Sequence, residues 1–334
     1  MILVLSQSSF ESTTDLVLDY LRAMGAPALR INGSDFDAGG DFSLRLDGGA
    51  VEIDAAPLRL DLAAVRAVWY RRWMEGQPFQ EGNLLRDGGN DSYVVTRLAA
   101  DHMVAELRRV SQTLFSQLSH AAWLSEPRTA SPNKLRVLQL AARAGLATPA
   151  TLVTTSRDQL QRFAAVHGPV ITKPIGDFDC FTLDGQGHIF YTRELDPELI
   201  ASLPAHFFPS LFQERLVKEY EVRVFHLAGE SWASAIFSQL DPRTATDFRR
   251  YNLQRPNRVV PFALPADCAE RIVRLMAELE LESGSLDLVR TADGRLVFLE
   301  VNPVGQFGMV SQPCNYHLEH KVAQRLASMA GHGV

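Results

Sequence analysis

The chain has 334 residues, of which 46% are hydrophobic and 22% are charged, and its formal net charge is −6. This length supports two or three subdomains with a large core, and the composition is typical of a globular protein. The negative charge argues against non-specific binding to nucleic acid or to a membrane. Three cysteines, Cys180, Cys268 and Cys314, share no short motif, which favours a reducing cytoplasm over a disulfide scaffold.

The first 122 residues are expected to form an α/β domain. The chain opens with a strand, a helix and a strand, an order that is typical of a doubly wound layer. Apolar spacing and turn residues then predict a hairpin, another strand and a long helix. In chain order, we expect a strand at 2–5, a helix at 13–24, a strand at 29–32, a hairpin at 42–54, a strand at 68–73 and a helix at 91–120.

The strand at 68–73 carries two adjacent arginines, Arg71 and Arg72. Successive side chains of a strand point to opposite faces. At most one of the two arginines should therefore face a site, and the other should form an ion pair. The sequence does not decide which one does which.

A second segment is expected over residues 123–217, after a boundary that contains Pro127 and Pro132. Ser131 and Pro132 predict a helix N-terminus, and Lys134 therefore stands near a candidate anion site. Residues 151–217 should form a small α+β lid. Within it, the strand at 169–174 ends in Lys173, and a lysine is a good point-charge partner for phosphate.

The third segment, residues 218–334, should return to a larger sheet with a helix at 264–280 and a closing helix at 314–329. Residues 211–225 read as a strand, a polar connection and a second strand with Glu221 and Arg223 on one face. Glu221 has a plainer explanation, because charged residues on a sheet often pair with neighbours such as Arg223 or Lys218.

A carboxylate pair is expected near the C-terminus. The apolar run at 296–299 leads into Glu300 and Asn302, which point the same way on a strand. The turn Asp293–Gly294 predicts a hairpin that brings Asp287 close to Glu300. Oxygen ligands of this kind suit Mg²⁺. A lone Asp or a lone Glu-x-Asn-Pro would be ordinary at a strand end, and the combination across a hairpin favours the metal site.

These residues resemble a known family. Seven positions match, in type and order, the nucleotide-binding and metal-binding residues of the ATP-grasp carboxylate–amine ligases. They are Lys134, Lys173, the pair Gln213 and Glu214, Glu221, Asp287, Glu300 and Asn302. More narrowly, the segments 69–73, 247–251 and 302–308 resemble the graspetide synthetases, which make ω-ester or ω-amide rings in ribosomal peptides. The run at 306–316 is similar to the grasp-with-spasm subgroup.

The resemblance implies an α/β fold in which a doubly wound pre-ATP-grasp domain precedes an ATP-grasp core with its lid. It also implies ATP and Mg²⁺ as cofactors. The adenine would meet the hinge residues Gln213, Glu214, Arg215 and Leu216, the ribose hydroxyls would meet Glu221, and Asp287, Glu300 and Asn302 would hold the metal. One departure from the family is that the segment after Lys173 contains only Gly176 where a glycine-rich loop often covers the phosphates.

Two arginines and one aspartate are the catalytic candidates. Guanidinium groups suit an acyl phosphate, which points to Arg223 and Arg249. Asp247 would take the proton of the attacking group. Asp247 could instead orient an arginine, and Arg249 could belong to an ordinary loop.

The implied reaction activates an Asp or Glu side chain of a precursor peptide with ATP, for attack by a Ser/Thr hydroxyl or a Lys amine of the same peptide. The expected partner is that peptide, with its leader and core, and we also expect a cytoplasmic homodimer. Two other functions stay open: an intermolecular amino-acid or peptide ligase, and a nucleotide-binding module without catalysis. The complete metal set disfavours the second.

Overall fold

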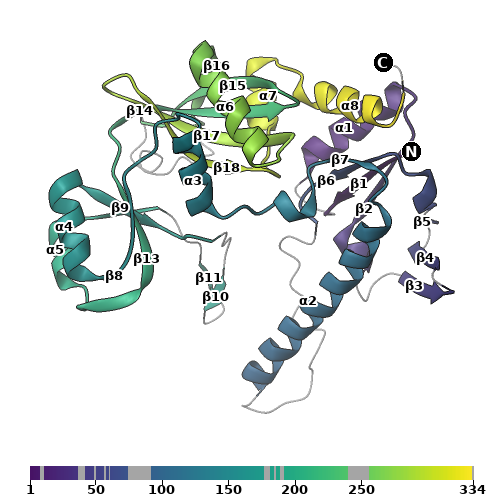
Figure 1. Cartoon of the computed structure of the whole chain (residues 1–334), viewed down its shortest axis with the longest axis horizontal. Coiled ribbons are helices and arrows are strands. Elements are labelled where there is room, and N and C mark those ends of the chain that lie inside the picture. The colour runs from purple at the N-terminus through teal and green to yellow at the C-terminus, as the bar shows by residue number, and fades with distance from the viewer. Residues whose placement is uncertain are drawn as a thin grey trace. The chain divides into compact units, whose positions relative to one another are not determined.

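The structure is a computed structural model that describes residues 1–7, 11–36, 42–48, 50–55, 58–59, 61–73, 92–176, 181–183, 186–188, 192–239 and 256–332. It divides into two compact units (Figure 1). Unit 1 contains residues 1–126 and 317–334, and unit 2 contains residues 127–316.

Unit 1 is built on a parallel sheet with the strand order β2-β1-β6-β7. The βαβ opening is therefore confirmed, and so is the hairpin, which β3 and β4 form. The elements of unit 1 are β1 (Ile2–Ser6), α1 (Ser12–Ala23), β2 (Ala28–Asn32), η1 (Gly33–Phe36), β3 (Phe42–Asp47), β4 (Ala50–Ala55), β5 (Leu58–Arg59), η2 (Leu62–Ala64), β6 (Ala67–Tyr70), α2 (Ser92–Gln117), β7 (Ala122–Leu124) and α8 (Leu318–Met329).

The last helix belongs to unit 1. The sequence places the closing helix, expected at 314–329, with the C-terminal sheet, whereas the structure forms it as α8 of unit 1, after a separate helix α7 (Gly308–Cys314). Asn315 and His317, between the two helices, have left-handed backbones with φ of 55° and 53°. α8 packs on α1 and β6, because it buries an apolar face that includes Leu318, Val322 and Leu326.

Arg71 and Arg72 both turn to one buried carboxylate. β6 ends at Tyr70, so the alternation of a strand no longer holds at the two arginines, and the prediction of opposite faces is wrong. Arg71 Nε lies 3.5 Å from Glu11 Oε2, and Arg72 Nε lies 3.4 Å from Glu11 Oε1. Thr14 Oγ1 donates a hydrogen bond of 2.6 Å to the same carboxylate. The Glu11 side chain is fully buried.

We expect Glu11→Gln to destabilise unit 1 by about 3–5 kcal/mol, because it leaves two guanidinium groups without their buried anion. Urea unfolding followed by tryptophan fluorescence measures this, since Trp69 and Trp73 both lie in unit 1. The matched control is Glu52→Gln, which removes an exposed ion pair with Arg45 and should change stability by less than about 1 kcal/mol. Equal effects of the two changes would contradict the prediction.

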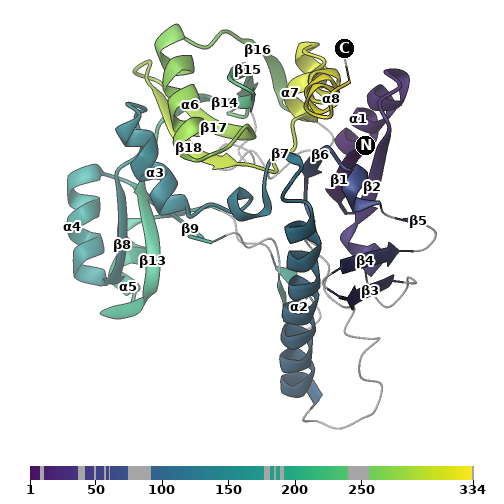
Figure 2. The same ribbon diagram turned by 45° about the vertical axis from the view of Figure 1, so that its right-hand side comes forward.

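Unit 2 contains two large antiparallel sheets and the two-stranded antiparallel sheet β10-β11 (Figures 1 and 2). The main sheet has the order β16-β15-β14-β17-β18, and the lid sheet has the order β12-β9-β13-β8. The elements of unit 2 are η4 (Pro127–Thr129), α3 (Lys134–Arg143), β8 (Thr151–Ser156), α4 (Arg157–His167), β9 (Val170–Lys173), β10 (Phe181–Leu183), β11 (Gln186–His188), β12 (Arg193–Leu195), α5 (Pro197–Ser202), β13 (His206–Glu214), β14 (Lys218–Leu227), β15 (Glu230–Phe237), β16 (Arg258–Phe262), α6 (Ala266–Glu278), β17 (Ser283–Thr291), β18 (Leu296–Asn302) and α7.

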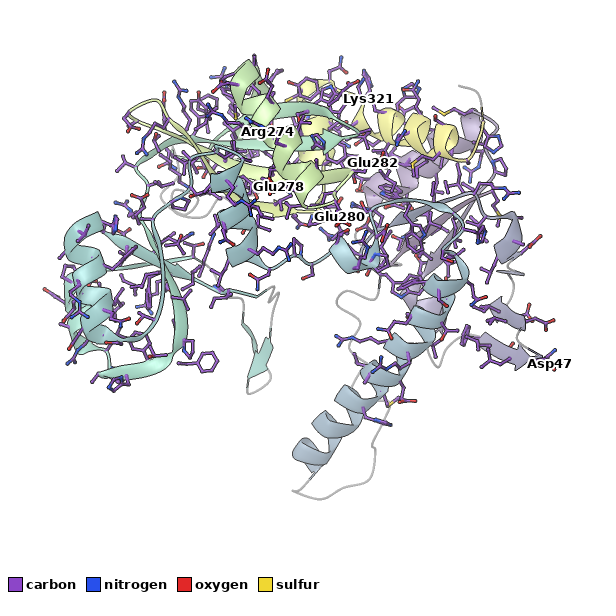
Figure 3. The ribbon with its side chains drawn as sticks, viewed as in Figure 1. Asp47, Arg274, Glu278, Glu280, Glu282 and Lys321 are labelled. Atoms are coloured by element: carbon purple, nitrogen blue, oxygen red, sulfur yellow. The ribbon has the colours of Figure 1, made fainter. Side chains whose placement is uncertain are left out.

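Helices pack on both large sheets, and α7 contacts β14, β15 and β16 of the main sheet. α3 and α6 pack on the main sheet through a buried cluster that includes Val137, Ile272, Leu288 and Phe298. Figure 3 labels Arg274 and Glu278 on α6, and both side chains are exposed. In the lid sheet, α4 packs on β8 and β13 (Figure 2). The small α+β lid expected from the sequence is therefore confirmed.

The helix α3 begins differently from the prediction. Asn133, and not Ser131, caps it, because the Asn133 side chain accepts hydrogen bonds from the backbone N–H groups of Leu135 (3.0 Å) and Arg136 (3.1 Å). Asn is as good a helix cap as Ser. Lys134 is therefore the first residue of α3.

The β14–β15 hairpin encloses a neutral histidine. Burial lowers the pKa of His226 to about 4. The backbone N–H of Gly229 donates to Nε2 (3.3 Å), so Nδ1 carries the proton and donates to Ser231 Oγ, 3.0 Å away. Both bonds close the turn of the hairpin.

This histidine predicts a loss of stability in acid. Its pKa is lower in the folded chain than in the unfolded chain, so its contribution is complete above about pH 6.5 and is lost as the pH falls toward 4. The loss is on the order of 3 kcal/mol. Urea unfolding at a series of pH values should show it in the wild type and in the control His206→Gln, an exposed histidine. In His226→Gln, which does not titrate, the loss should be absent; a loss that persists there would contradict the assignment.

The free cysteines Cys268 and Cys314 are both buried in unit 2, and burial raises the pKa of both thiols. Cys180 lies outside the described residues. Within the described part of the chain, no helix has the length and hydropathy that a membrane span needs.

Candidate functional site

The expected carboxylate pair exists in unit 2. β17 and β18 form the predicted hairpin, and Asp287 lies directly opposite Glu300. The register shifts between Asp287 and Leu288, so the pair stands at a β-bulge, a feature that often re-aims side chains beside active sites. Both carboxylates are partly exposed, and Asn302 at the end of β18 is exposed. The three oxygen-bearing side chains are thus accessible at one end of the hairpin.

Two cations neutralise the pair. Arg223 faces Asp287 across the sheet, and its Nη1 lies 2.5 Å from Asp287 Oδ2. Lys173 Nζ lies 3.9 Å from Glu300 Oε2. Arg223 comes from the main sheet, whereas Lys173 ends a strand of the lid sheet. The ends of the two sheets therefore meet at this pair.

The donor set fits a hard cation. The described residues contain no group of three or more His, Cys, Asp or Glu side chains placed to hold a metal ion. Here, however, the third ligand would be an amide. Asn302 Oδ1 accepts a hydrogen bond of 3.1 Å from the backbone N–H of Val304, which fixes its orientation. Two carboxylates and one amide oxygen, with phosphate oxygens from a substrate, are ligands that suit Mg²⁺.

A glycine lets the loop after β18 approach Arg223. A Cβ at Gly305 would lie 2.9 Å from Ser285 Cβ and 3.1 Å from Arg223 Nη2, which is closer than packed atoms tolerate. In addition, Arg223 Nη2 donates to the carbonyl of Gln306 at 3.4 Å. The side chain of Arg223 is thus held by Asp287 on one side and by this loop on the other, and only 8% of the residue is exposed.

A cavity of about 160 Å³ opens beside this cluster. Both sheets contribute to its walls, and the connection from β13 to β14 crosses it. Its lining includes Ile171, two residues before Lys173, and Leu299, directly before Glu300, so the cavity lies close to the carboxylate pair along both strands. The lining residues are Pro149, Ile171, Thr192, Gln213, Glu214, Arg215, Leu216, Val217, Lys218, Gln239, Val289 and Leu299.

The hinge from Gln213 to Leu216 is fixed by its side chains. Gln213 Nε2 donates to Thr151 Oγ1 (2.9 Å), and Glu214 Oε1 accepts from the backbone N–H of Ala150 (2.9 Å). Arg215 Nε pairs with Glu194 Oε2 at 3.0 Å. These contacts bind the hinge to the lid sheet. The backbone of the hinge is therefore held in a fixed position along the cavity.

Glu221 lies away from the cavity surface. It is 5% exposed and does not belong to the described lining. Its carboxylate contacts Lys218 Nζ and accepts a hydrogen bond from Ser238 Oγ. Lys218 and Gln239, which the sequence analysis did not select, do line the cavity. The one signal for Lys218 in the sequence was its opposite charge close to Glu221.

The described contacts do not test the other predicted residues. Lys134 stands at the start of α3, and neither the cavity lining nor the ion pairs of the carboxylate cluster include it among the described residues. Asp247 and Arg249 lie outside the described residues, and so does the segment 177–180 that follows Gly176.

Comparison with known proteins gives the fold. A family model described as the MvdD pre-ATP grasp domain matches residues 1–87. The macrocyclase MdnC from Microcystis aeruginosa, solved with its precursor peptide MdnA, has 24% sequence identity and a TM-score of 0.81, with 98% of this chain and 99% of that chain covered. The chain has an ATP-grasp fold.

Two more ATP-grasp ligases are similar in structure. One is the RiPP-associated ligase from Chryseobacterium gregarium in complex with ADP and a leader and core peptide, with 22% identity, a TM-score of 0.82, and coverage of 98% of this chain and 96% of that chain. The other is PsnB complexed with a minimal precursor, Mg and ADP, with 22% identity, a TM-score of 0.71, and coverage of 98% and 97%. The resemblance to the macrocyclases of ribosomal peptides is thus confirmed for the fold. No curated protein sequence matches this ATP-grasp chain.

Proposed function

We propose that this ATP-grasp protein is an ATP-dependent macrocyclase of a ribosomally made precursor peptide. It would convert Asp or Glu side chains of the peptide into acyl phosphates, and a Ser/Thr hydroxyl or a Lys amine would then close a lactone or lactam ring. One observation carries the proposal: a carboxylate pair with two cations, Lys173 and Arg223, adjoins a cavity crossed by the hinge. The similar structures, which hold precursor peptides, ADP and Mg, support it.

Each residue would have a defined task in this reaction. Asp287, Glu300 and Asn302 would hold Mg²⁺, which, when bound, would offset the negative charge of the phosphate groups. The hinge from Gln213 to Leu216 would hold the adenine, and Lys173 would contact a phosphate. Arg223, fixed by Asp287 and the Gln306 carbonyl, would direct a rigid positive charge toward the forming acyl phosphate.

Four predicted residues keep the roles that the sequence and the family resemblance give them. They are Glu221 at the ribose, Lys134 at a phosphate, Arg249 at the acyl phosphate and Asp247 as the base for the attacking group. Their roles stay predictions, because the described contacts do not test them. A homodimer and a cytoplasmic location also belong to the proposal, and sedimentation of the purified chain would test the first.

The deciding experiment is mass spectrometry of a short peptide encoded beside this gene and rich in Thr, Ser, Asp and Glu, incubated with the enzyme, ATP and Mg²⁺. A macrocyclase lowers the peptide mass by one water for each ring. An intermolecular ligase instead raises the mass by the added group, and a nucleotide-binding module changes neither the peptide nor ATP. Hydroxylamine should capture the activated carboxylate as a hydroxamate, so an unchanged peptide without hydroxamate or ADP would refute catalysis.

We expect Lys173→Met to weaken the binding of Mg²⁺-nucleotide by about tenfold or more, since it removes a charged contact to phosphate. Binding of the precursor peptide should change little. Calorimetry with a non-hydrolysable ATP analogue and, separately, with the peptide measures both affinities. Lys321→Met, on α8 of unit 1, is the control and should leave both unchanged. Equal losses for the two ligands in Lys173→Met would indicate a folding defect instead.

A further inference from the structure

A tight turn follows β18 and leads into a short loop on the main sheet. Asn302, Pro303 and Gly305 occupy its first, second and fourth positions, where these residue types are favoured in a β-turn. The backbone N–H of Gly305 closes the turn by donating to the Asn302 carbonyl at 3.1 Å. The buried ring of Phe307 then packs on Phe225, with 4.5 Å between the ring centroids. Both ends of this loop are therefore fixed on the sheet.

The carbonyl of Gln306 lies between these two ends and accepts hydrogen bonds from two side chains. Arg223 Nη2 donates to it at 3.4 Å, and Ser285 Oγ donates to it at 3.3 Å. A carbonyl oxygen has two lone pairs and can accept both bonds. Ser285 stands two residues before Asp287 on β17, so both side chains point to the same face of the sheet. The fully buried hydroxyl of Ser285 therefore shares its acceptor with Arg223.

The orientation of Arg223 depends on this carbonyl. Arg223 Nη1 contacts Asp287 Oδ2 at 2.5 Å. Its buried Nε has no hydrogen-bond partner among the residues that the structure describes. The ion pair with Asp287 and the bond to Gln306 are thus the two described contacts that fix the guanidinium plane. If the second contact loosens, the group can turn about the first, and the planar donor loses its direction toward a developing charge.

We propose that Ser285 is a positioning residue for the formation of the acyl phosphate. Its hydroxyl holds the Gln306 carbonyl, and this carbonyl sets the direction of the Arg223 guanidinium. Ser285 itself touches no substrate, because it is fully buried. This inference rests on the proposed function, since it requires Arg223 to act on the forming acyl phosphate.

The test is Ser285→Ala, with ring formation measured by mass spectrometry over a series of peptide concentrations. We expect kcat to fall by roughly 3–10-fold, the range of one lost neutral hydrogen bond. The KM for the peptide, the affinity for Mg²⁺-ADP and the melting temperature should change little. The matched control is Ser234→Ala. Ser234 is also fully buried and lies opposite Arg223 on β15, but its Oγ has no hydrogen-bond partner within the described part of the chain, so kcat should stay normal. Equal losses in the two variants would overturn the inference.

A second set of variants shows whether Ser285 acts through the guanidinium. Arg223→Lys has no planar fork, so adding Ser285→Ala to it should cause no further loss of kcat. The same loss in both backgrounds would overturn the inference, and so would a normal kcat in Ser285→Ala. Absence of rings and of ADP release in the wild type would instead refute the proposed function, and with it this role of Ser285.

Gly305→Ala displaces the same carbonyl from the backbone. Gly305 does not have a left-handed backbone, so only contacts oppose an alanine there. Its Cβ would lie 2.9 Å from Ser285 Cβ and 3.1 Å from Arg223 Nη2. Because the loop must move away from Arg223, we expect kcat to fall by roughly 100-fold, with a smaller change in the affinity for Mg²⁺-ADP. A normal kcat in Gly305→Ala would show that the loop does not orient Arg223, and would overturn the inference.

Discussion

Asp287→Asn and Glu300→Gln are each expected to lower the rate of ADP release in the presence of peptide by about 10²–10³-fold or more, because phosphoryl transfer depends on in-line positioning of the reacting groups. Each change removes one anionic ligand from the pair on β17 and β18. Asn302→Ala should act in the same direction. The rate is measured with a coupled ADP assay at saturating peptide, over a titration of Mg²⁺.

The Mg²⁺ titration distinguishes a metal ligand from a structural residue. A lost ligand raises the Mg²⁺ concentration needed for half of the remaining activity, whereas a folding defect lowers the activity at every concentration. The matched control is Asp293→Asn in the turn of the same hairpin. Its carboxylate is 58% exposed and pairs with Arg295, so we expect a normal rate. Near-normal ADP release in all three site variants would show that the metal assignment is wrong.

Arg223→Lys is the second change with a large expected effect. It keeps the positive charge but removes the planar fork that reaches both Asp287 and the Gln306 carbonyl. We expect product formation to fall by about 10²–10³-fold, the cost of losing one preorganised donor at a developing charge. ADP binding should change much less. Calorimetry for binding and mass spectrometry for rings measure the two effects separately.

The control for Arg223→Lys is Arg290→Lys on the same sheet. Arg290 is a neighbour of β14 through Tyr220, and its side chain packs against Gly294 in the turn of the hairpin. We expect normal activity there. A normal rate in Arg223→Lys would mean that the charge alone is sufficient. If Arg223→Lys loses both ADP binding and ring formation, Arg223 mainly maintains the shape of the site.

The carboxylate pair could be predicted because local rules determine it. Two apolar strands and the turn Asp293–Gly294 specify one hairpin, which brings Asp287 close to Glu300. A regular register would pair Asp287 with Leu299, and the bulge after Asp287 makes it face Glu300 instead. The βαβ opening and the lid followed from patterns of the same local kind. Lys173 and Glu300 come from different sheets and lie close to each other. This proximity could be expected only through the family resemblance.

The contacts that the sequence could not decide depend on where regular structure stops. Arg71 and Arg72 converge on Glu11 because β6 ends one residue before them. Lys218 was one of two expected charge partners of Glu221, and the irregularity in β14 accompanies its selection over Arg223. Neither the end of a strand nor a bulge has a strong sequence signal. The placement of α8 was missed for another reason: its apolar face fits any apolar surface, and only the three-dimensional fold selects α1 and β6.

The placement of α8 has a consequence for synthesis on the ribosome. Unit 1 takes its first 126 residues from the beginning of the chain and its last helix from the end. The surface of α1 and β6 that α8 covers must therefore wait until all of unit 2 has been translated. We expect unit 2 to acquire protease resistance first and unit 1 to do so only after Leu318, Val322 and Leu326 have emerged. Pulse proteolysis of stalled nascent chains would establish the order, and early protection of residues 1–126 would contradict it.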